Sequence, residues 1–155
     1  TKKTASLLAS CCGIGANSTN EDEEAVEAII AMGNAVGIAF QIKDDLFDYG
    51  DNKIGKPTGI DIIEKKMTLP LIYALNVADE RERRAMVKII KKDKKSKKQV
   101  NEVIAFVKQK GGLDYAQKRM MEYKAEAEGL LSRIPGDGDT SYISALINYV
   151  IERKK

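Results

Sequence analysis

Apolar residues recur at three- and four-residue steps along most of the chain, which is the spacing that places them on one face of a helix. Strand-like alternation of apolar and polar residues is missing over any useful length, and the sequence contains no internal repeat. The pattern therefore predicts an all-α chain with six or seven helices. The expected helices cover residues 1–12, 21–49, 61–76, 80–91, 97–110, 113–133 and 140–153.

The second of these helices is the longest and has the clearest apolar face. Its first turn, Glu21 to Glu24, is acidic and suits the positive end of a helix dipole. One of the three residues before this turn is expected to be the N-cap: Ser18, Thr19 or Asn20. The expected buried face consists of Val26, Ile29, Ile30, Gly33, Val36, Gly37, Phe40 and Phe47. The two glycines on that face would let a neighbouring helix or a ligand approach closely.

Glycine and proline mark the predicted boundaries between helices. The first helix is expected to end at Gly13-Ile14-Gly15, and residues 51–59 are expected to form a loop because they include three Gly or Pro residues. Pro70 marks a kink or a short break in the helix over 61–76. Gly111-Gly112 and the segment 135–138 separate the last three helices.

The composition is that of one ordinary soluble domain, with 155 residues of which 43% are hydrophobic and 32% are charged. A net charge of +3 is too small to indicate nucleic-acid binding. We expect no membrane-spanning run and no signal peptide, and hence a cytoplasmic protein without stable membrane insertion. The adjacent Cys11 and Cys12 fit neither a redox nor a zinc motif, so both are expected to be buried in a reducing compartment.

Histidine is absent from the sequence, and this restricts the chemistry. Ser-His-Asp and Cys-His nucleophiles, histidine bases and nearly all zinc catalysis are excluded. Any reaction must use carboxylates, lysines, hydroxyls, amides and hard metal ions.

Three aspartates gather where the long helix is expected to end, in Asp44-Asp45-Leu46-Phe47-Asp48. Asp44 and Asp48 lie within roughly 40° of each other around a helix, with Gln41 one turn earlier on that side. Carboxylates at a helix C-terminus repel one another and oppose the dipole, and a bound cation would offset both effects. Oxygen ligands without histidine favour Mg²⁺. The alternative is an exposed acidic helix end.

Lysines follow the acidic cluster. Lys53 and Lys56 lie in the expected loop, and Lys65-Lys66 precede Met67-Thr68-Leu69-Pro70. Acidic metal ligands followed by such lysines suit a metal–diphosphate complex, whereas the alternative is a solvated lysine loop. A second run, Lys88 to Lys98, contains seven lysines and one aspartate but no aromatic residue for base stacking, so we expect a solvated turn rather than a nucleic-acid or membrane patch.

Taken together, the central motifs resemble the second aspartate-rich region of the trans-polyprenyl diphosphate synthases. The ordered set is FQxxDDxxD beginning at Phe40, GKxxGxD beginning at Gly55 and KxTLP beginning at Lys66. A bare DDxxD would be weak evidence, but this ordered set is highly specific. The residues of this motif set are similar to those of bacterial medium- or long-chain synthases.

The resemblance extends outward on both sides of these motifs. Lys3-Thr4-Ala5 resembles the Lys-Thr motif on the preceding helix of the family. Gly111-Gly112, Tyr115-Ala116 and the basic tail from Glu152 to Lys155 resemble its C-terminal region. Essentially the whole chain is covered, but only by the C-terminal half of the family.

The family resemblance implies the fold and the activity. It implies an antiparallel helical bundle of the isoprenoid synthase type around an apolar cavity, usually paired into homodimers. The implied reaction ionises an allylic diphosphate, lets isopentenyl diphosphate attack the cation and releases a proton. The implied cofactor is Mg²⁺, and the implied partners are the two diphosphates and a second copy of the chain.

The resemblance also assigns roles to residues. Asp44 would be the main Mg²⁺ ligand, supported by Asp45 and Asp48 directly or through water. Diphosphate contacts would come from Lys3, Lys56 and Lys66; because a glycine often stands at Lys65 in the family, the contact from this pair is left open between Lys65 and Lys66. Residues that would face the allylic substrate are Thr4, Phe40 and Gln41.

The first aspartate-rich motif of the family and its basic segment for isopentenyl diphosphate are not found in the 155 residues. The sequence begins at Thr1 with residues that fit the middle of a helix, so we expect a single all-α region, 1–155, that lacks the N-terminal half and is inactive alone. The alternatives are a non-catalytic subunit of a hetero-oligomeric prenyl synthase and a related class-I terpenoid synthase. Product chain length is not encoded in these motifs.

Overall fold

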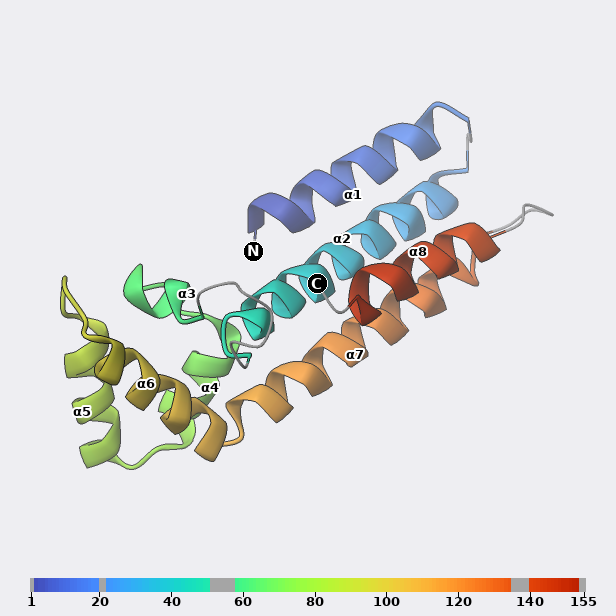
Figure 1. Cartoon of the computed structure of the whole chain (residues 1–155). Helices are drawn as coiled ribbons and strands as arrows, with labels where there is room; N and C mark the ends of the chain where they lie inside the picture. The colour runs from blue at the N-terminus through green and yellow to red at the C-terminus, as the bar shows by residue number, and fades with distance from the viewer. Residues whose placement is uncertain (1, 20–21, 51–57, 135–139, 154–155) are drawn as a thin grey trace. The chain divides into compact units, whose positions relative to one another are not determined.

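The computed structural model describes residues 2–19, 22–50, 58–134 and 140–153. These residues form helices and no strand, which confirms the predicted all-α class (Figure 1). The helices are α1 (Lys2–Asn17), α2 (Glu23–Phe47), α3 (Ile60–Ile63), α4 (Leu69–Val77), α5 (Glu80–Ile90), α6 (Lys97–Gln109), α7 (Gly112–Leu131) and α8 (Ser141–Glu152).

The first helix does not end at its glycines, so that prediction was wrong. α1 continues through Gly13 and Gly15 to Asn17, where the Ser18 hydroxyl donates to the Gly15 carbonyl at 2.7 Å. A Cβ added at Gly13 would lie 2.7 Å from Cγ1 of Ile30 on α2. This glycine therefore serves close packing within a helix rather than termination.

The start of α2 also differs from the prediction. The Asp22 carboxylate accepts a hydrogen bond from the backbone N–H of Glu24 at 3.1 Å. Ser18 and Thr19 instead donate to carbonyls of α1, and Asn20 lies outside the described residues. The C-terminus of α2 at Phe47 agrees with the expected end near Tyr49-Gly50 to within two or three residues.

The region predicted as one helix over 61–76 is two helices, α3 and α4, and this accounts for the eighth helix among the described residues. The break falls at residues 64–68, before Pro70 rather than at it. Pro70 occupies the first turn of α4, where its missing N–H costs no intrahelical hydrogen bond. Lys65 adopts a left-handed backbone with φ of 59°, which turns the chain between the two helices.

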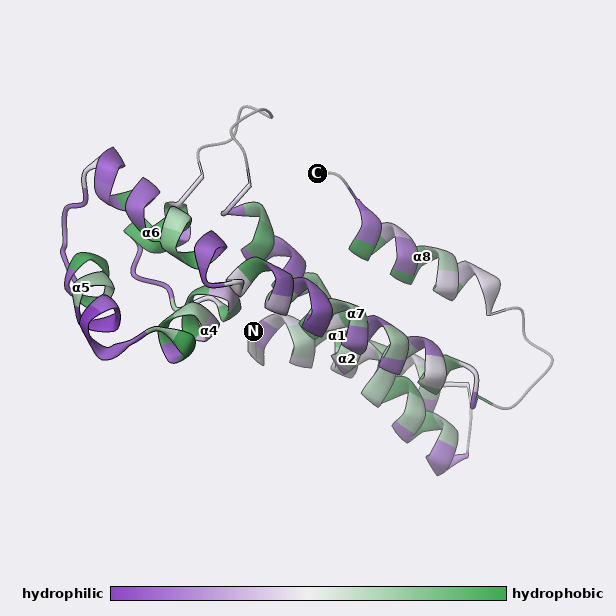
Figure 2. Ribbon diagram, turned by 90° about the horizontal axis from the view of Figure 1, so that it is seen from below, coloured by the Kyte–Doolittle hydropathy of each residue, from purple (hydrophilic) through white to green (hydrophobic). Residues whose placement is uncertain are grey.

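The described residues belong to two compact units, one from residues 1–43 and 119–155 (unit 1) and one from residues 44–118 (unit 2). Helices α5 and α6 of unit 2 each begin with a capping box, Asp79 with Glu82 and Ser96 with Gln99. Their hydrophilic and hydrophobic residues alternate with the helical repeat (Figure 2), and the lysine-rich segment forms the expected turn between them. The core of unit 2 consists of Tyr49, Ile62, Leu71, Ala74, Leu75, Met86, Ile90, Val100, Val103, Phe106 and Val107.

In unit 1, α1 runs alongside α2 in the opposite direction, and glycine makes their contact close (Figure 1). A Cβ added at Gly37 would lie 2.6 Å from the Cα of Ala5, and one at Gly33 would lie 2.9 Å from Sγ of Cys12. The predicted close approach at these two glycines is confirmed.

Two other expectations about unit 1 fail. Cys11 is exposed and Cys12 is only half-buried, so the two cysteines are not both core residues. Contrary to the expectation that no apolar run approaches a membrane span, α2 is long and apolar enough to cross a membrane by length and composition, although 44% of its apolar window is buried within the protein.

Candidate functional site

The acidic end of α2 lies in unit 2, where Asp44 and Asp45 occupy its last turn. The pKa of Asp45 is raised to about 6, chiefly by burial and to a smaller extent by the nearby charges of Asp61 and Asp44. The backbone N–H of Leu69 opposes this shift with a long contact of 3.5 Å to Asp45 Oδ2. Ionised carboxylates at this helix end are therefore costly without a cation.

Asp48 follows the last turn of α2 and binds the start of α3. Its Oδ1 accepts from the N–H of Ile60 at 2.9 Å, and its Oδ2 accepts from the N–H of Asp61 at 3.0 Å. The Asp48 carbonyl accepts from the N–H of Gly59 at 2.9 Å. Burial raises the pKa of Asp48 above its ordinary value, and the amide hydrogen bonds oppose that rise.

Only glycine fits at the residue that leads into α3. Gly59 has φ of 79°, in the left-handed region, and a Cβ there would lie 2.3 Å from Cγ1 of Val100 in α6. The glycine of the GKxxGxD motif is therefore required by backbone conformation and by packing.

Lys66 pairs with two carboxylates that follow the acidic cluster in the chain, Asp61 and Glu64. Its Nζ donates to Asp61 Oδ1 at 2.9 Å and lies 2.8 Å from Glu64 Oε2, and these carboxylates hold the pKa of Lys66 above its ordinary value. Lys65 is directed elsewhere and pairs with Asp93 in the turn between α5 and α6. Of the two lysines that the sequence left open, Lys66 is the one that pairs with the aspartate of the GKxxGxD motif.

A buried pair of hydroxyls lies behind this surface. The hydroxyls of Tyr49 and Thr68 are 2.6 Å apart, and both residues are buried. Burial raises the pKa of Tyr49, so its hydroxyl stays protonated and available to the pair. No role was predicted for Tyr49, Thr68 or Asp61, although Thr68 is a fixed position of the KxTLP motif and Asp61 a fixed position of the GKxxGxD motif.

In unit 1, two predicted residues form a direct hydrogen bond. The Thr4 hydroxyl donates to Oε1 of Gln41 at 2.8 Å. The close backbone contact between Gly37 and Ala5 brings these two side chains together. Lys3, the residue before Thr4 on α1, is exposed.

Phe40 has a partner that the sequence did not reveal. The guanidinium of Arg153 lies 4.6 Å from the centroid of the Phe40 ring, within the range of a cation–π contact. The resemblance of the C-terminal tail to the family was the only signal that pointed towards this arginine.

Unit 1 also contains an apolar groove of about 480 Å³. Almost all of its lining is apolar, with Thr4 among the few polar contributors. The lining residues come from α1, α2 and α8, and include Leu7, Leu8, Val36, Phe40, Leu146 and Val150.

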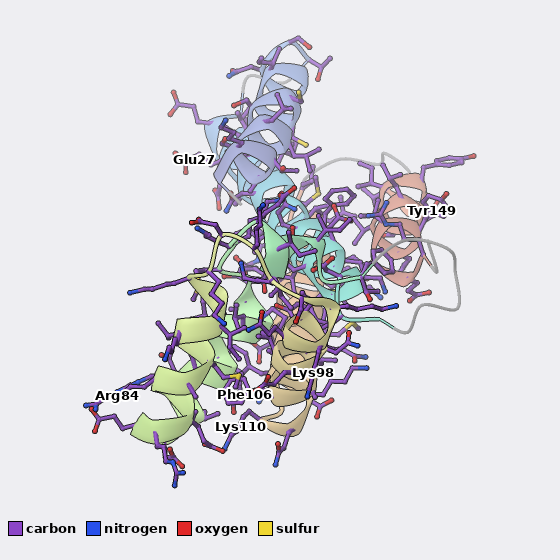
Figure 3. All side chains as sticks on the ribbon, turned by 60° about the vertical axis from the view of Figure 1, so that its left-hand side comes forward. Glu27, Arg84, Lys98, Phe106, Lys110 and Tyr149 are labelled. Atoms are coloured by element: carbon purple, nitrogen blue, oxygen red, sulfur yellow. The ribbon has the colours of Figure 1, made fainter. Side chains whose placement is uncertain are left out.

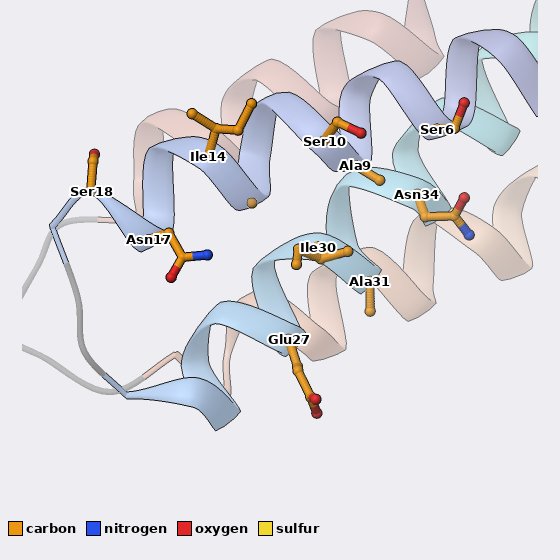
Figure 4. Close-up of a pocket in the computed structure, with 11 residues that line it drawn as sticks. Ser6, Ala9, Ser10, Ile14, Asn17, Ser18, Glu27, Ile30, Ala31 and Asn34 are labelled. Atoms are coloured by element: carbon orange, nitrogen blue, oxygen red, sulfur yellow. The ribbon is translucent and has the colours of Figure 1, made fainter.

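A second hollow, of about 940 Å³, is open to solvent on another part of α1 and α2 (Figure 4). Ser6, Ser10 and Asn34 lie along it, together with Ile14 and Ile30. It contains none of the residues predicted to bind substrate or metal, so it contributes nothing to the candidate chemistry.

The carboxylates fit one mode of Mg²⁺ binding. Among the described residues, no three acidic, cysteine or histidine side chains form a ready-made metal cage. Mg²⁺ usually takes one or two protein carboxylates and completes its shell with water and substrate phosphate. Asp44 and Asp45 match that mode, whereas Lys56 lies outside the described residues.

The chain is similar to known proteins over nearly its whole length. The model of the polyprenyl synthetase family matches residues 1–107. The geranylfarnesyl diphosphate synthase of Aeropyrum pernix is 34% identical over 99% of this chain and 48% of its own length. Heptaprenyl diphosphate synthase component 2 of Bacillus subtilis is 30% identical over 99% of this chain and 43% of its own length.

Solved structures agree with this likeness. A decaprenyl diphosphate synthase from Rhodobacter capsulatus matches 99% of this chain and 48% of its own chain, with a TM-score of 0.88 and 34% identity. The present chain thus spans about half the length of the relatives that it matches.

Proposed function

Because this chain belongs to the polyprenyl synthetase family, we propose that it is the catalytic C-terminal half of an all-trans polyprenyl diphosphate synthase, which condenses isopentenyl diphosphate with an allylic diphosphate. The observation that carries the proposal is the set of contacts at the end of α2, where aspartates and Lys66 meet through Asp61. Carboxylates and an ammonium group side by side suit a complex of a divalent cation with a diphosphate.

Asp44 is the proposed main ligand of Mg²⁺, with Asp45 beside it. When bound there, Mg²⁺ supplies positive charge that stabilises the leaving diphosphate. The raised pKa of Asp45 supports this assignment, because a cation offsets the cost of ionising that carboxyl group. Asp48, whose two carboxylate oxygens accept amides of α3, supports the cluster from its edge.

Lys66, Lys56 and Lys3 are the proposed diphosphate contacts. Each acts as a point charge on the leaving group as the allylic C–O bond breaks. The electron pair of that bond departs with the diphosphate, and the double bond of isopentenyl diphosphate supplies the electrons of the new C–C bond. The proton lost afterwards passes to an oxygen of the departed diphosphate, in agreement with a sequence that has no histidine.

Thr4 and Gln41 are the proposed stabilisers of the allylic cation. Their hydrogen bond fixes the orientation of both side chains, so that oxygen dipoles are in place before charge develops. Phe40 and the apolar groove of unit 1 would hold the prenyl chain, because that groove offers an almost wholly apolar lining.

The whole protein is proposed to be cytoplasmic, without stable membrane insertion, and to work as a homodimer. The 155 residues alone are proposed to be inactive, since they carry one of the family's two aspartate-rich motifs. A hetero-oligomeric subunit is the second candidate, favoured by one observation: a relative covering 99% of the chain carries the name "component 2".

Substitution of Asp44 tests the proposal in the protein expressed from its complete gene. Asp44→Ala is expected to lower turnover of labelled isopentenyl diphosphate about a thousandfold or more, since it removes the main metal ligand, while circular dichroism stays unchanged. The matched control is Asp114→Ala, which removes an exposed carboxylate from α7 and is expected to have no effect. Near-normal turnover in Asp44→Ala would refute the ligand assignment. Mg²⁺-dependent pyrophosphate binding that is lost in Asp44→Ala distinguishes an enzyme from a non-catalytic subunit.

A further inference from the structure

The short helix α3 depends on Asp48 for its position. A four-residue helix is not stable by itself, because the conformational entropy lost in forming its first turn exceeds the free energy gained from the hydrogen bonds of that turn. Three consecutive N–H groups, from Gly59 to Asp61, donate to oxygens of Asp48. Ile62 adds a fully buried side chain in the core of unit 2. The start of α3 is therefore fixed to the end of α2 through one residue.

Asp61 links the start of α3 to Lys66. Its N–H donates to Asp48, its carbonyl accepts from the N–H of Lys66 at 2.8 Å, and its carboxylate accepts from Lys66 Nζ at 2.9 Å. The Asp61 side chain is 19% exposed, whereas that of Glu64, the other carboxylate on Lys66, is 52% exposed. Asp61 thus joins both the backbone and the ammonium group of Lys66 to α3, whereas the more exposed Glu64 contacts the ammonium group alone.

We propose that Asp48 and Asp61 are positioning residues for Lys66: Asp48 holds the start of α3, and Asp61 orients the Lys66 ammonium towards the diphosphate. The inference rests on the proposed function of Lys66 as a diphosphate contact. It gives Asp48 a structural role through hydrogen bonds to amides, in place of direct ligation of the metal. It also assigns to Asp61, the aspartate of the GKxxGxD motif, a role in positioning Lys66 that its sequence position does not indicate.

Two matched substitutions test the role of Asp61, with the Kd for inorganic pyrophosphate measured calorimetrically at saturating Mg²⁺ on the protein from its complete gene. Asp61→Asn and Glu64→Gln each remove one negative charge next to Lys66, so the change in net charge is the same for both. We expect Asp61→Asn to weaken pyrophosphate binding about tenfold and Glu64→Gln to leave it unchanged. Asp61→Glu keeps the charge but displaces it by one methylene group, and should weaken binding as well. Equal effects of Asp61→Asn and Glu64→Gln would overturn the proposal.

The role of Asp48 is separated from metal ligation by the Mg²⁺ dependence of pyrophosphate binding. Asp48→Asn keeps one carbonyl acceptor for α3 and loses the second. We expect it to weaken pyrophosphate binding about fivefold while the half-saturating Mg²⁺ concentration stays as in the unsubstituted protein. A large increase in that Mg²⁺ concentration would show that Asp48 is a ligand and would overturn its positioning role.

A double-mutant cycle shows whether Asp61 acts through Lys66. In a Lys66→Met background, Asp61→Asn should have no further effect on pyrophosphate affinity, since the group that it positions is gone. An undiminished effect would overturn the proposal. If Lys66→Met itself leaves the affinity unchanged, the diphosphate role of Lys66 fails together with the inference. If Lys66→Met weakens binding and Asp61→Asn does not, only the inference fails and the proposed function stands.

Discussion

The two units of the chain follow the same helical periodicity but bury different kinds of side chain. Unit 2 gathers large apolar residues such as Tyr49, Leu71 and Phe106 into one core. Unit 1 buries many alanines, including Ala5, and its helices meet at glycines. Within unit 2, Figure 3 shows the buried Phe106 inside and the charged Arg84 extending from the surface.

The difference is clearest on α1, where the small residues are inside and the large apolar ones are outside. Ala5 is 4% exposed, whereas Leu7 on the same helix is 64% exposed. Burial of alanine contributes less hydrophobic free energy than burial of leucine, but it allows two backbones to approach. Unit 2 should therefore be sensitive to loss of side-chain volume, and unit 1 should be sensitive to added volume at its helix contacts.

The largest expected effect is the loss of a leucine from the core of unit 2. Leu71→Ala removes most of a side chain that is 0% exposed and leaves a cavity in the core, so it should lower the free energy of unfolding by about 2–5 kcal/mol. Leu146→Ala, the matched control on α8, removes a side chain that is 61% exposed and should change stability by about 0.5 kcal/mol or less. Urea unfolding of both variants measures the difference. Comparable losses would show that the two units do not differ in this way.

A smaller effect is expected where a methyl group is added to unit 1. Gly37→Ala places a Cβ against the backbone of Ala5, and the forced separation of α1 and α2 should destabilise the protein by about 1–3 kcal/mol. Gly15→Ala is the control, because a Cβ there meets nothing within 4 Å. It should stabilise α1 by about 0.5–1 kcal/mol through helix propensity. Thermal unfolding should move in opposite directions for the two variants, and a shared direction would contradict the assignment.

The smallest effect concerns the pH dependence of Asp45. Its folded-state pKa, about 6, lies above the ordinary value of 3.8, so the protonated form favours folding. The stability that this group contributes is present below about pH 4 and is lost as pH rises through about 6. Asp45→Asn should therefore raise Tm relative to the unsubstituted protein at about pH 8 but not at about pH 4, in metal-free buffer. The same difference in Tm at both pH values, or no difference in either, would refute the raised pKa.

Helices whose boundaries depend on local residues were predicted best. The expected ranges for α5, α6, α7 and α8 agree with the structure to within one or two residues at each end. Local signals mark these boundaries, such as Gly111 before α7, and the capping boxes of α5 and α6 act within four residues. The predictions failed at Gly13 and Pro70. Gly13 packs against Ile30 inside a helix, and Pro70 lies in the first turn of a helix that begins at Leu69.

The sequence by itself determined the helical class, the order of the motifs and the set of aspartates and lysines available for chemistry. Only the tertiary structure decided that Lys66 pairs with Asp61 whereas Lys65 pairs with Asp93, because a left-handed backbone at Lys65 separates the directions of the two side chains. It also decided that Asp48 binds the amides of α3 and that Tyr49 meets Thr68. The contacts of Asp48, Tyr49 and Lys65 join residues 12 to 28 positions apart, and helical periodicity relates only neighbours three or four positions apart along the chain.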